Sequence, residues 1–355
     1  MKFSTNWFNR LTDLKKLSLL ILGLLMLLTG FLGQGLYTKV YGVNTTKEGF
    51  VYLPTNSQFK DVENLLRPFL KRVEPFVWLA EKKNYPNTIK AGKYLIAKGM
   101  NNNELINLLR SGQQTVVNLS FNNQHSLEKL AGRISTQIEA DSSTLVAHFT
   151  DKAFLSSNGF SKNTALAMYL PNTYQCYWNI SAVAFRDRML AEYNRFWNPE
   201  RLQQAKALNL SNIEVITLAA IVQKETTVLS ERPIVAGLYL NRLKRHWPLQ
   251  ADPTVIFALR ASTGKETPIR RVLTKDLGIR SPYNTYLHKG LPPGPIAMPD
   301  ISAIDAVLQP TEHDYFYMCA SVTDIGKHVF SKRISEHNRN AVKYQSWLNK
   351  QGIKR

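Results

Sequence analysis

Six polar side chains interrupt apolar or turn-forming stretches and are the first candidates for chemistry. They are Gln223, Glu225, Gln250, Asp252, Asn284 and Tyr286. Glu225 is the strongest of them, because it follows a largely apolar run, 215–222. A carboxyl group at the end of a buried helix loses part of its solvation. This loss raises its pKa and favours the protonated form that a general acid needs near neutral pH.

Three predicted helices must position these side chains. Ser211, with Glu214 three residues later, has the pattern of a capping box, and apolar residues then cover nearly every face, which predicts a buried helix that ends at Glu225. A second helix is expected to open at Ser230, with Pro233 in its first turn. Asp252 before Pro253 predicts the start of a third helix, so Gln250 and Asp252 lie in a turn that can fold back toward Glu225.

An ordinary structural role for Glu225 competes with the catalytic one. A carboxylate at the end of a helix often lies in solvent, paired here with Lys224 or Arg232. Spacing alone does not separate the two interpretations. The exact order of the neighbouring residues does carry further information.

Several long strings of residues resemble one family. They are Val-Gln-Lys-Glu-Thr at 222–226, Ser-Glu-Arg-Pro-Ile-Val-Ala-Gly-Leu-Tyr-Leu-Asn-Arg-Leu at 230–243, Leu-Gln-Ala-Asp-Pro-Thr-Val-Ile at 249–256, Ser-Pro-Tyr-Asn-Thr-Tyr-Leu at 281–287, Gly-Leu-Pro-Pro-Gly-Pro-Ile-Ala at 290–297 and Glu-His-Asn at 336–338. In this order they resemble the membrane-anchored endolytic murein transglycosylases, the YceG-like family. The resemblance runs from the N-terminal apolar segment to the C-terminus.

The resemblance implies a fold and a catalytic residue. The fold class would be α+β, with an N-terminal transmembrane helix, a small LysM-like α+β subdomain at 38–115 and a larger mixed α/β catalytic domain at 116–355. The second acidic position of the family's Ile-Glu-Lys-Glu-Thr string is the catalytic acid, and it falls on Glu225. The first falls on Gln223, where the family usually has Glu. A neutral side chain there would raise the pKa of Glu225 less than a second carboxylate would.

A lytic transglycosylase needs only one carboxyl group, whereas most glycosidases use two. The resemblance implies cleavage within peptidoglycan strands between N-acetylmuramic acid and N-acetylglucosamine, giving 1,6-anhydro ends, with peptidoglycan synthases as partners. Gln223, Gln250, Asp252, Asn284 and Tyr286 are then candidates for binding the substrate. Two alternatives stay open: a peptidoglycan hydrolase that uses Glu225 with Asp252, and a non-catalytic scaffold that binds the cell wall.

The N-terminus has the pattern of a membrane anchor. Residues 1–16 are polar and mostly basic, and 17–37 are almost wholly apolar and without charge, about the length of a spanning helix. Because the basic residues precede this segment, we expect a cytoplasmic N-terminus, a single pass through the cell (inner) membrane and a catalytic domain on the extracytoplasmic, or periplasmic, side. A cleaved signal peptide competes, but the apolar stretch is long and lacks a small-x-small cleavage site.

The composition limits the partners and cofactors. The chain has 355 residues and a formal net charge of +19, which predicts attraction to polyanions such as anionic lipids and cell-wall polymers. No motif for binding nucleic acid, a metal or an organic cofactor is present, so we expect none of these. Cys176 and Cys319 have no redox or zinc spacing; buried thiols are favoured over a disulfide.

Local patterns predict the remaining elements. In 38–115 they are a strand at 49–53, an amphipathic helix through 59–69, an extended segment at 85–96 and a helix from 102 to 109 that stops at Gly112. Residues 116–210 are predicted to be mostly helical. Residues 314–320 and 327–330 alternate as a β-hairpin closed near Gly326.

Overall fold

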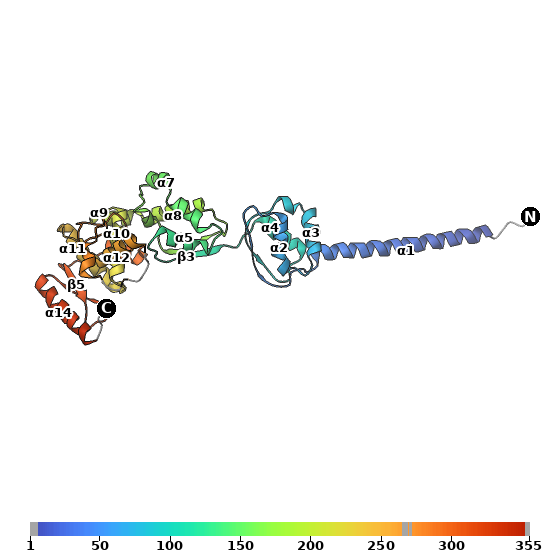
Figure 1. Cartoon of the computed structure of the whole chain (residues 1–355). Helices are drawn as coiled ribbons and strands as arrows, with labels where there is room; N and C mark the ends of the chain where they lie inside the picture. The colour runs from blue at the N-terminus through green and yellow to red at the C-terminus, as the bar shows by residue number, and fades with distance from the viewer. Residues whose placement is uncertain (1–5, 265–268, 270–271, 352–355) are drawn as a thin grey trace, which may run out of the picture. The chain divides into compact units, whose positions relative to one another are not determined.

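The computed structural model describes residues 6–264, 269 and 272–351 (Figure 1). The fold is α+β, as predicted: helices dominate, and the described strands form three two-stranded sheets. The chain divides into two compact units. The first runs to Val117 and includes Cys176–Asn179, and the second comprises Asn118–Gln175 and the chain from Ile180 onward.

The N-terminal helix α1 (Asn6–Tyr41) contains the predicted apolar segment and is longer than it (Figure 1). Within it, Lys15–Tyr41 is long and apolar enough to cross a bilayer, and none of its most apolar stretch is buried. Such a helix is compatible with a single-pass membrane anchor. The helix extends beyond 17–37 because polar flanking residues can also be helical. Hydropathy marks only the apolar part of such a helix.

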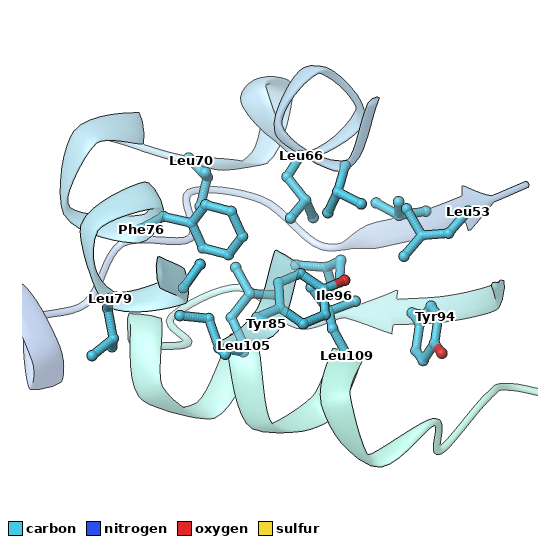
Figure 2. Packing of buried hydrophobic residues seen from close by; sticks show 14 residues of the cluster. Leu53, Leu66, Leu70, Phe76, Leu79, Tyr85, Tyr94, Ile96, Leu105 and Leu109 are labelled. Carbon is cyan, nitrogen blue, oxygen red and sulfur yellow. The ribbon is translucent and has the colours of Figure 1, made fainter. Parts of the chain in front are cut away.

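The rest of the first unit packs helices on a two-stranded sheet. Strands β1 (Gly49–Leu53) and β2 (Gly92–Ile96) pair antiparallel. The helical elements are α2 (Phe59–Leu66), η1 (Arg67–Phe69), α3 (Val73–Lys82), η2 (Tyr85–Asn87) and α4 (Asn102–Ser111). Figure 2 shows side chains from both strands and from α2, α3 and α4 converging on one core, including Leu66, Phe76, Ile96 and Leu105.

Of two local predictions for this unit, one is confirmed and the other is wrong in part. The helix ending at Gly112 is confirmed, since Gly112 adopts the left-handed conformation (φ 73°) that glycine allows at a helix end. The extended segment at 85–96 is wrong in its first part. Tyr85–Asn87 form a 3-10 turn instead, because Pro86 fits the first turn of a helix and Asn84 tolerates positive φ.

The first half of the second unit combines a small sheet with helices. Its elements are β3 (Val117–Phe121), α5 (Leu127–Ser135), α6 (Ser142–Phe149), α7 (Lys152–Ser157), η3 (Ala165–Met168), β4 (Asn172–Cys176), α8 (Ala182–Phe196) and α9 (Pro199–Ala207). The strands β3 and β4 pair across this half. The mostly helical prediction missed them because each is only five residues long.

The second half surrounds α10 (Asn212–Glu225). Its other elements are η4 (Leu229–Glu231), α11 (Arg232–Lys244), α12 (Asp252–Thr263), η5 (Thr274–Gly278), α13 (Ile301–Leu308), β5 (Tyr317–Ala320), β6 (His328–Ser331) and α14 (Ile334–Lys350). Helices α11, α12 and α13 all contact α10. The hairpin β5–β6 is confirmed, pairing Tyr317 with Ser331. The predicted helix start at Ser230 is wrong by one residue. Ser230 lies in η4, and Glu231 is the N-cap of α11. Cys176 and Cys319 are both in the described part of the chain and form no disulfide.

Candidate active site

Glu225 is the last residue of α10, a helix fixed at its start and along its length. Ser211 and Glu214 form the predicted capping box, and residues 215–223 are all buried. Glu225 itself is partly buried. A helix held on all sides by apolar contacts keeps the position of its final side chain well defined. The sequence therefore predicted this part of the site from local pattern alone.

Tyr239 of α11 holds the Glu225 carboxyl group. Its Oη donates a hydrogen bond of 2.7 Å to Glu225 Oε1. Tyr239 is only 1% exposed, so its hydroxyl has little access to water and depends on this partner. Tyr239 was not among the residues predicted for the site, and no local pattern in the sequence indicates this contact. The ring is indeed core, but its hydroxyl belongs to the site.

The surroundings of Glu225 raise its pKa to about 7. Burial is the largest cause, the Tyr239 hydrogen bond acts in the opposite direction, the negative charge of Asp252 raises the pKa further, and the Arg242 guanidinium lowers it. The predicted loss of solvation is therefore confirmed. A carboxyl group with this pKa is protonated in about half of the molecules at neutral pH, which suits a group that must first give and then take back a proton.

Arg242 is a second residue that sequence reasoning missed. It is 9% exposed, its Nε donates to Phe316 O at 2.8 Å, and its guanidinium also binds Leu249 O at 2.5 Å. It thereby ties α11 to the start of the hairpin and to the turn before α12. The positive charge of this buried guanidinium interacts with Glu225, and its backbone hydrogen bonds fix its position near the acid. Its only sequence signal was its place in the Leu-Asn-Arg-Leu string.

Asp252 and Tyr286 come from segments far apart in the chain and form a pair. Tyr286 Oη donates to Asp252 Oδ1 at 2.6 Å. Asp252 is the first residue of α12 and is exposed, so its carboxylate is available beside Glu225. The turn before α12 is anchored by Thr285, which accepts the N–H of Ala251 through its Oγ1 at 3.0 Å. The expected folding of this turn toward Glu225 is thus supported by the electrostatic contact of the two carboxyl groups.

Asn284 and Gln223 lie beneath the surface and bind backbone groups. Asn284 is 0% exposed; its Nδ2 donates to Leu277 O and Ile279 O, and its Oδ1 accepts the N–H of Tyr286. It shapes the turn that presents Tyr286. Gln223 is 8% exposed and its Oε1 accepts the N–H of Asp300, the N-cap of α13. In these positions Asn284 holds the turn before Tyr286, and Gln223 holds the start of α13.

Gln250 has a different environment from the other candidates. Its side chain is exposed, and its backbone adopts a left-handed conformation (φ 50°) with its N–H bound to Thr285 O at 3.1 Å. The side chain is therefore directed by a tight turn next to Asp252. It is brought to the same region as Asp252 and Tyr286.

A buried polar cluster fixes the chain just after Glu225. Thr226 Oγ1 donates to Glu231 Oε2 at 2.9 Å, and Glu231 Oε1 accepts the N–H of His328 at 2.6 Å. Thr226 is 3% and Glu231 5% exposed. The end of α10 is thereby joined to strand β6. Sequence spacing did not predict this link, which spans about a hundred residues.

A cleft of about 970 Å³ runs along α12 beside this site. Pro253, Ile256, Phe257, Arg260 and Ala261 line it from one face of the helix, following the spacing of a helical turn. Lys224 lines it next to Glu225 in the chain. Glu225 itself is not among the lining residues, so the cleft begins beside the acid and not over it.

The described residues contain no cluster of three or more His, Cys, Asp or Glu side chains arranged to hold a metal ion. The groups that act on the pKa of Glu225 are Tyr239, Arg242 and Asp252.

Comparison with known proteins gives one family. A sequence model described as the YceG-like family matches residues 51–343. A Bacillus subtilis protein named endolytic murein transglycosylase is 30% identical over 319 residues, covering 84% of this chain and 85% of that protein. A Streptococcus pneumoniae protein with the same name is 27% identical over 330 residues; the match covers 85% of this chain and 59% of that longer protein.

The chain is also similar to solved structures. One of them is a 2.6 Å crystal structure of a putative YceG-like protein from Listeria monocytogenes, with a TM-score of 0.56 and 26% sequence identity. The match covers 82% of this chain and 98% of that one. The likeness thus extends over both compact units and not over the site alone.

Proposed function

The chain belongs to the YceG-like family, and we propose that it is an endolytic murein transglycosylase with Glu225 as its catalytic acid and base. The observation that carries the assignment of Glu225 is its environment. A carboxyl group with a pKa of about 7 is held by Tyr239 at the end of a buried helix, beside a cleft of about 970 Å³. The relatives named endolytic murein transglycosylase indicate the class of substrate.

In the first step Glu225 gives a proton. Tyr239 donates to Oε1, so in the protonated acid the proton is carried by Oε2 and is free to be transferred. It passes to the oxygen that joins N-acetylmuramic acid to N-acetylglucosamine, and this glycosidic bond breaks. The positive charge that develops at the anomeric carbon is stabilised by the carboxylates of Glu225 and Asp252.

In the second step Glu225 takes a proton back. The carboxylate removes the proton of the muramyl C6 hydroxyl, whose oxygen bonds to the anomeric carbon of the same sugar. The product is a 1,6-anhydro ring, and Glu225 is again protonated. Because the nucleophile belongs to the substrate, no bound water and no second catalytic carboxylate are required. Arg242 and Tyr239 stabilise the intermediate carboxylate form.

The other parts of the chain fit this activity. We assign α1 as a single-pass anchor with a cytoplasmic N-terminus, because basic residues precede the apolar segment, so the remainder lies on the outer side of the cell membrane. Residues 38–115 are assigned as a LysM-like subdomain and 116–355 as the catalytic domain. Glycan strands made at the membrane are then within reach, and peptidoglycan synthases are the proposed partners.

Analysis of chain ends tests the proposal. Purified glycan strands are digested with the wild type and with Glu225→Gln, and the products are analysed by mass spectrometry. We expect internal cleavage with 1,6-anhydro ends, and a loss of about 10²–10⁴-fold in rate for Glu225→Gln. Products heavier by one water, with reducing ends, would instead identify a hydrolase.

The scaffold alternative is tested in the same experiment and in cells. If Glu225→Gln digested strands at the wild-type rate, or replaced the wild type fully in cells, Glu225 would not be catalytic. Circular dichroism of both proteins controls for folding.

A further inference from the structure

The cleft along α12 carries more cationic than anionic side chains close to the acid. Among the residues that the structure describes, its lining includes the cationic side chains of Lys162, Lys224 and Arg260, and one carboxylate, Glu128. Lys224 directly precedes Glu225 in the chain, and Arg260 lies two turns along α12 from Pro253. In a peptide-bearing strand the lactyl carboxyl group of each N-acetylmuramic acid is joined to the peptide as an amide, so the sugars themselves carry no charge and give no reason for such a lining.

Lys224 and Arg260 lack the carboxylate partners that cations brought together in a protein normally have. Neither makes an ion pair with the residues that the structure describes. Asp300, a carboxylate that acts on Lys224, is itself 3.8 Å from Arg232. In addition, Arg260 Nε is buried and has no hydrogen-bond partner in the described chain. Such a guanidinium has unused donors beside a cavity.

The two cations also affect each other. Loss of solvation and the positive charge of Arg260 lower the pKa of Lys224, which shows that they share one electrostatic environment. Two like charges with no carboxylate in ion-pair contact repel each other, and an anion bound between them lowers this cost. Planar guanidinium groups pair with carboxylates through two parallel hydrogen bonds.

We propose that this cleft is a subsite for a carboxylate on the peptide side chains of the glycan, bound by Lys224 and Arg260 with Lys162. The inference rests on the proposed function, and it deepens it by naming the substituted part of the substrate that is recognised. Apolar groups at Ile256, Phe257 and Ile296 line the same cleft and suit the aliphatic part of a peptide. Because Lys224 adjoins Glu225, the subsite selects strands whose peptide-bearing sugar lies at the bond to be cut.

The test compares two forms of one substrate. Glycan strands that carry peptides are compared with bare strands, from which an amidase has removed the peptides and whose newly exposed lactyl carboxyl groups have been converted to amides. Both are digested by the wild type, Arg260→Gln and Lys162→Gln. For peptide-bearing strands we expect KM to rise about tenfold in Arg260→Gln, with kcat little changed, because a charge-assisted hydrogen bond is lost. For bare strands the rise is much smaller. An equal rise on both substrates, or no rise on either, would overturn the proposal.

Matched variants separate charge from structure. Arg260→Lys keeps the positive charge and should recover part of the affinity. Glu128→Gln removes the carboxylate from the same cleft and should lower KM for peptide-bearing strands only. Lys206→Gln removes one exposed positive charge from α9, outside the cleft lining, and should leave both substrates unaffected. If Lys206→Gln acts as strongly as Arg260→Gln, only the net charge matters and no subsite exists.

A binding measurement keeps this inference distinct from the activity. Calorimetry on the Glu225→Gln chain, with a soluble acidic stem peptide as the probe, needs no cleavage. We expect binding that weakens with added salt and is lost in Glu225→Gln with Arg260→Gln. If pyrophosphate bound there and the peptide did not, the carboxylate assignment would be wrong. If the peptide bound but wild type cut no strand, the proposed function would fail and the subsite would stand.

Discussion

Tyr239 Oη donates a 2.7 Å hydrogen bond to Glu225 Oε1 and joins the middle of α11 to the last residue of α10. The bond has two consequences. It fixes one carboxyl oxygen, which leaves the other to exchange the proton. It also stabilises the charged form of Glu225 and so lowers its pKa, whereas burial raises that pKa. The pKa of about 7 is the balance of these opposed effects.

Tyr239→Phe should raise the pKa of Glu225 above about 7, because it removes the hydrogen bond that stabilises the carboxylate. An acid catalyst loses activity as the pH rises through its pKa, so the alkaline limb of the pH–rate profile should move to higher pH by about 1–2 units. The profile of kcat/KM measures this. Tyr174→Phe, which removes another buried hydroxyl, bonded to Leu170 O, is the control and should leave the limb in place. A shift to lower pH in Tyr239→Phe would contradict the assignment.

Asp252→Asn should move the same limb in the opposite direction. The negative charge of Asp252 raises the pKa of Glu225, and an amide carries no charge. The hydrogen bond from Tyr286 can still be accepted by the amide oxygen, so the local geometry is kept. We expect the limb at lower pH and products that still end in 1,6-anhydro rings. Asp314→Asn, an exposed carboxylate paired with Lys332, is the matched loss of charge. Loss of all activity in Asp252→Asn would point to a second catalytic carboxyl group.

Glu225→Gln should stabilise the folded protein at neutral pH. The folded pKa is raised from 4.5 to about 7, so between these values the folded state holds a proton that the unfolded state has lost. Wild-type stability therefore falls as the pH rises through this window and is constant above it. The difference in Tm between Glu225→Gln and wild type should grow from pH 5 to about pH 8. Thermal unfolding at several pH values measures it, with the exposed Glu200→Gln as control. A difference that shrinks with rising pH would refute the raised pKa.

Gln223→Glu tests the departure from the usual family residue. A second carboxylate near Glu225 should raise its pKa and move the alkaline limb upward. The displacement should be small, because Gln223 Oε1 is bound to the N–H of Asp300 and residues two apart on a helix do not face each other. Gln203→Glu on α9 adds the same charge elsewhere in this unit and should not move the limb. No upward movement in Gln223→Glu would show that this position does not tune the acid.

Local patterns in the sequence were sufficient for the elements that carry the site. The capping box of Ser211 and Glu214, the buried run of α10, the start of α12 at Asp252 and the hairpin near Gly326 all depend on residues close together in the chain. The raised pKa of Glu225 also followed, because a carboxyl group at the end of an all-round apolar helix must lose water. The family resemblance came from the same local strings.

Contacts between distant segments were decided only by the tertiary structure. Tyr239 has the spacing of a core residue, and no local pattern reveals which group its hydroxyl meets. Asn284 and Gln223 were expected at the substrate, yet packing turns both toward backbone groups. Arg242 and the cationic cleft of Lys224 and Arg260 depend on how α10, α11 and α12 pack together. Periodicity fixes which face of a helix is buried, but the partner of each polar atom is set by the packing of elements that are far apart in the chain.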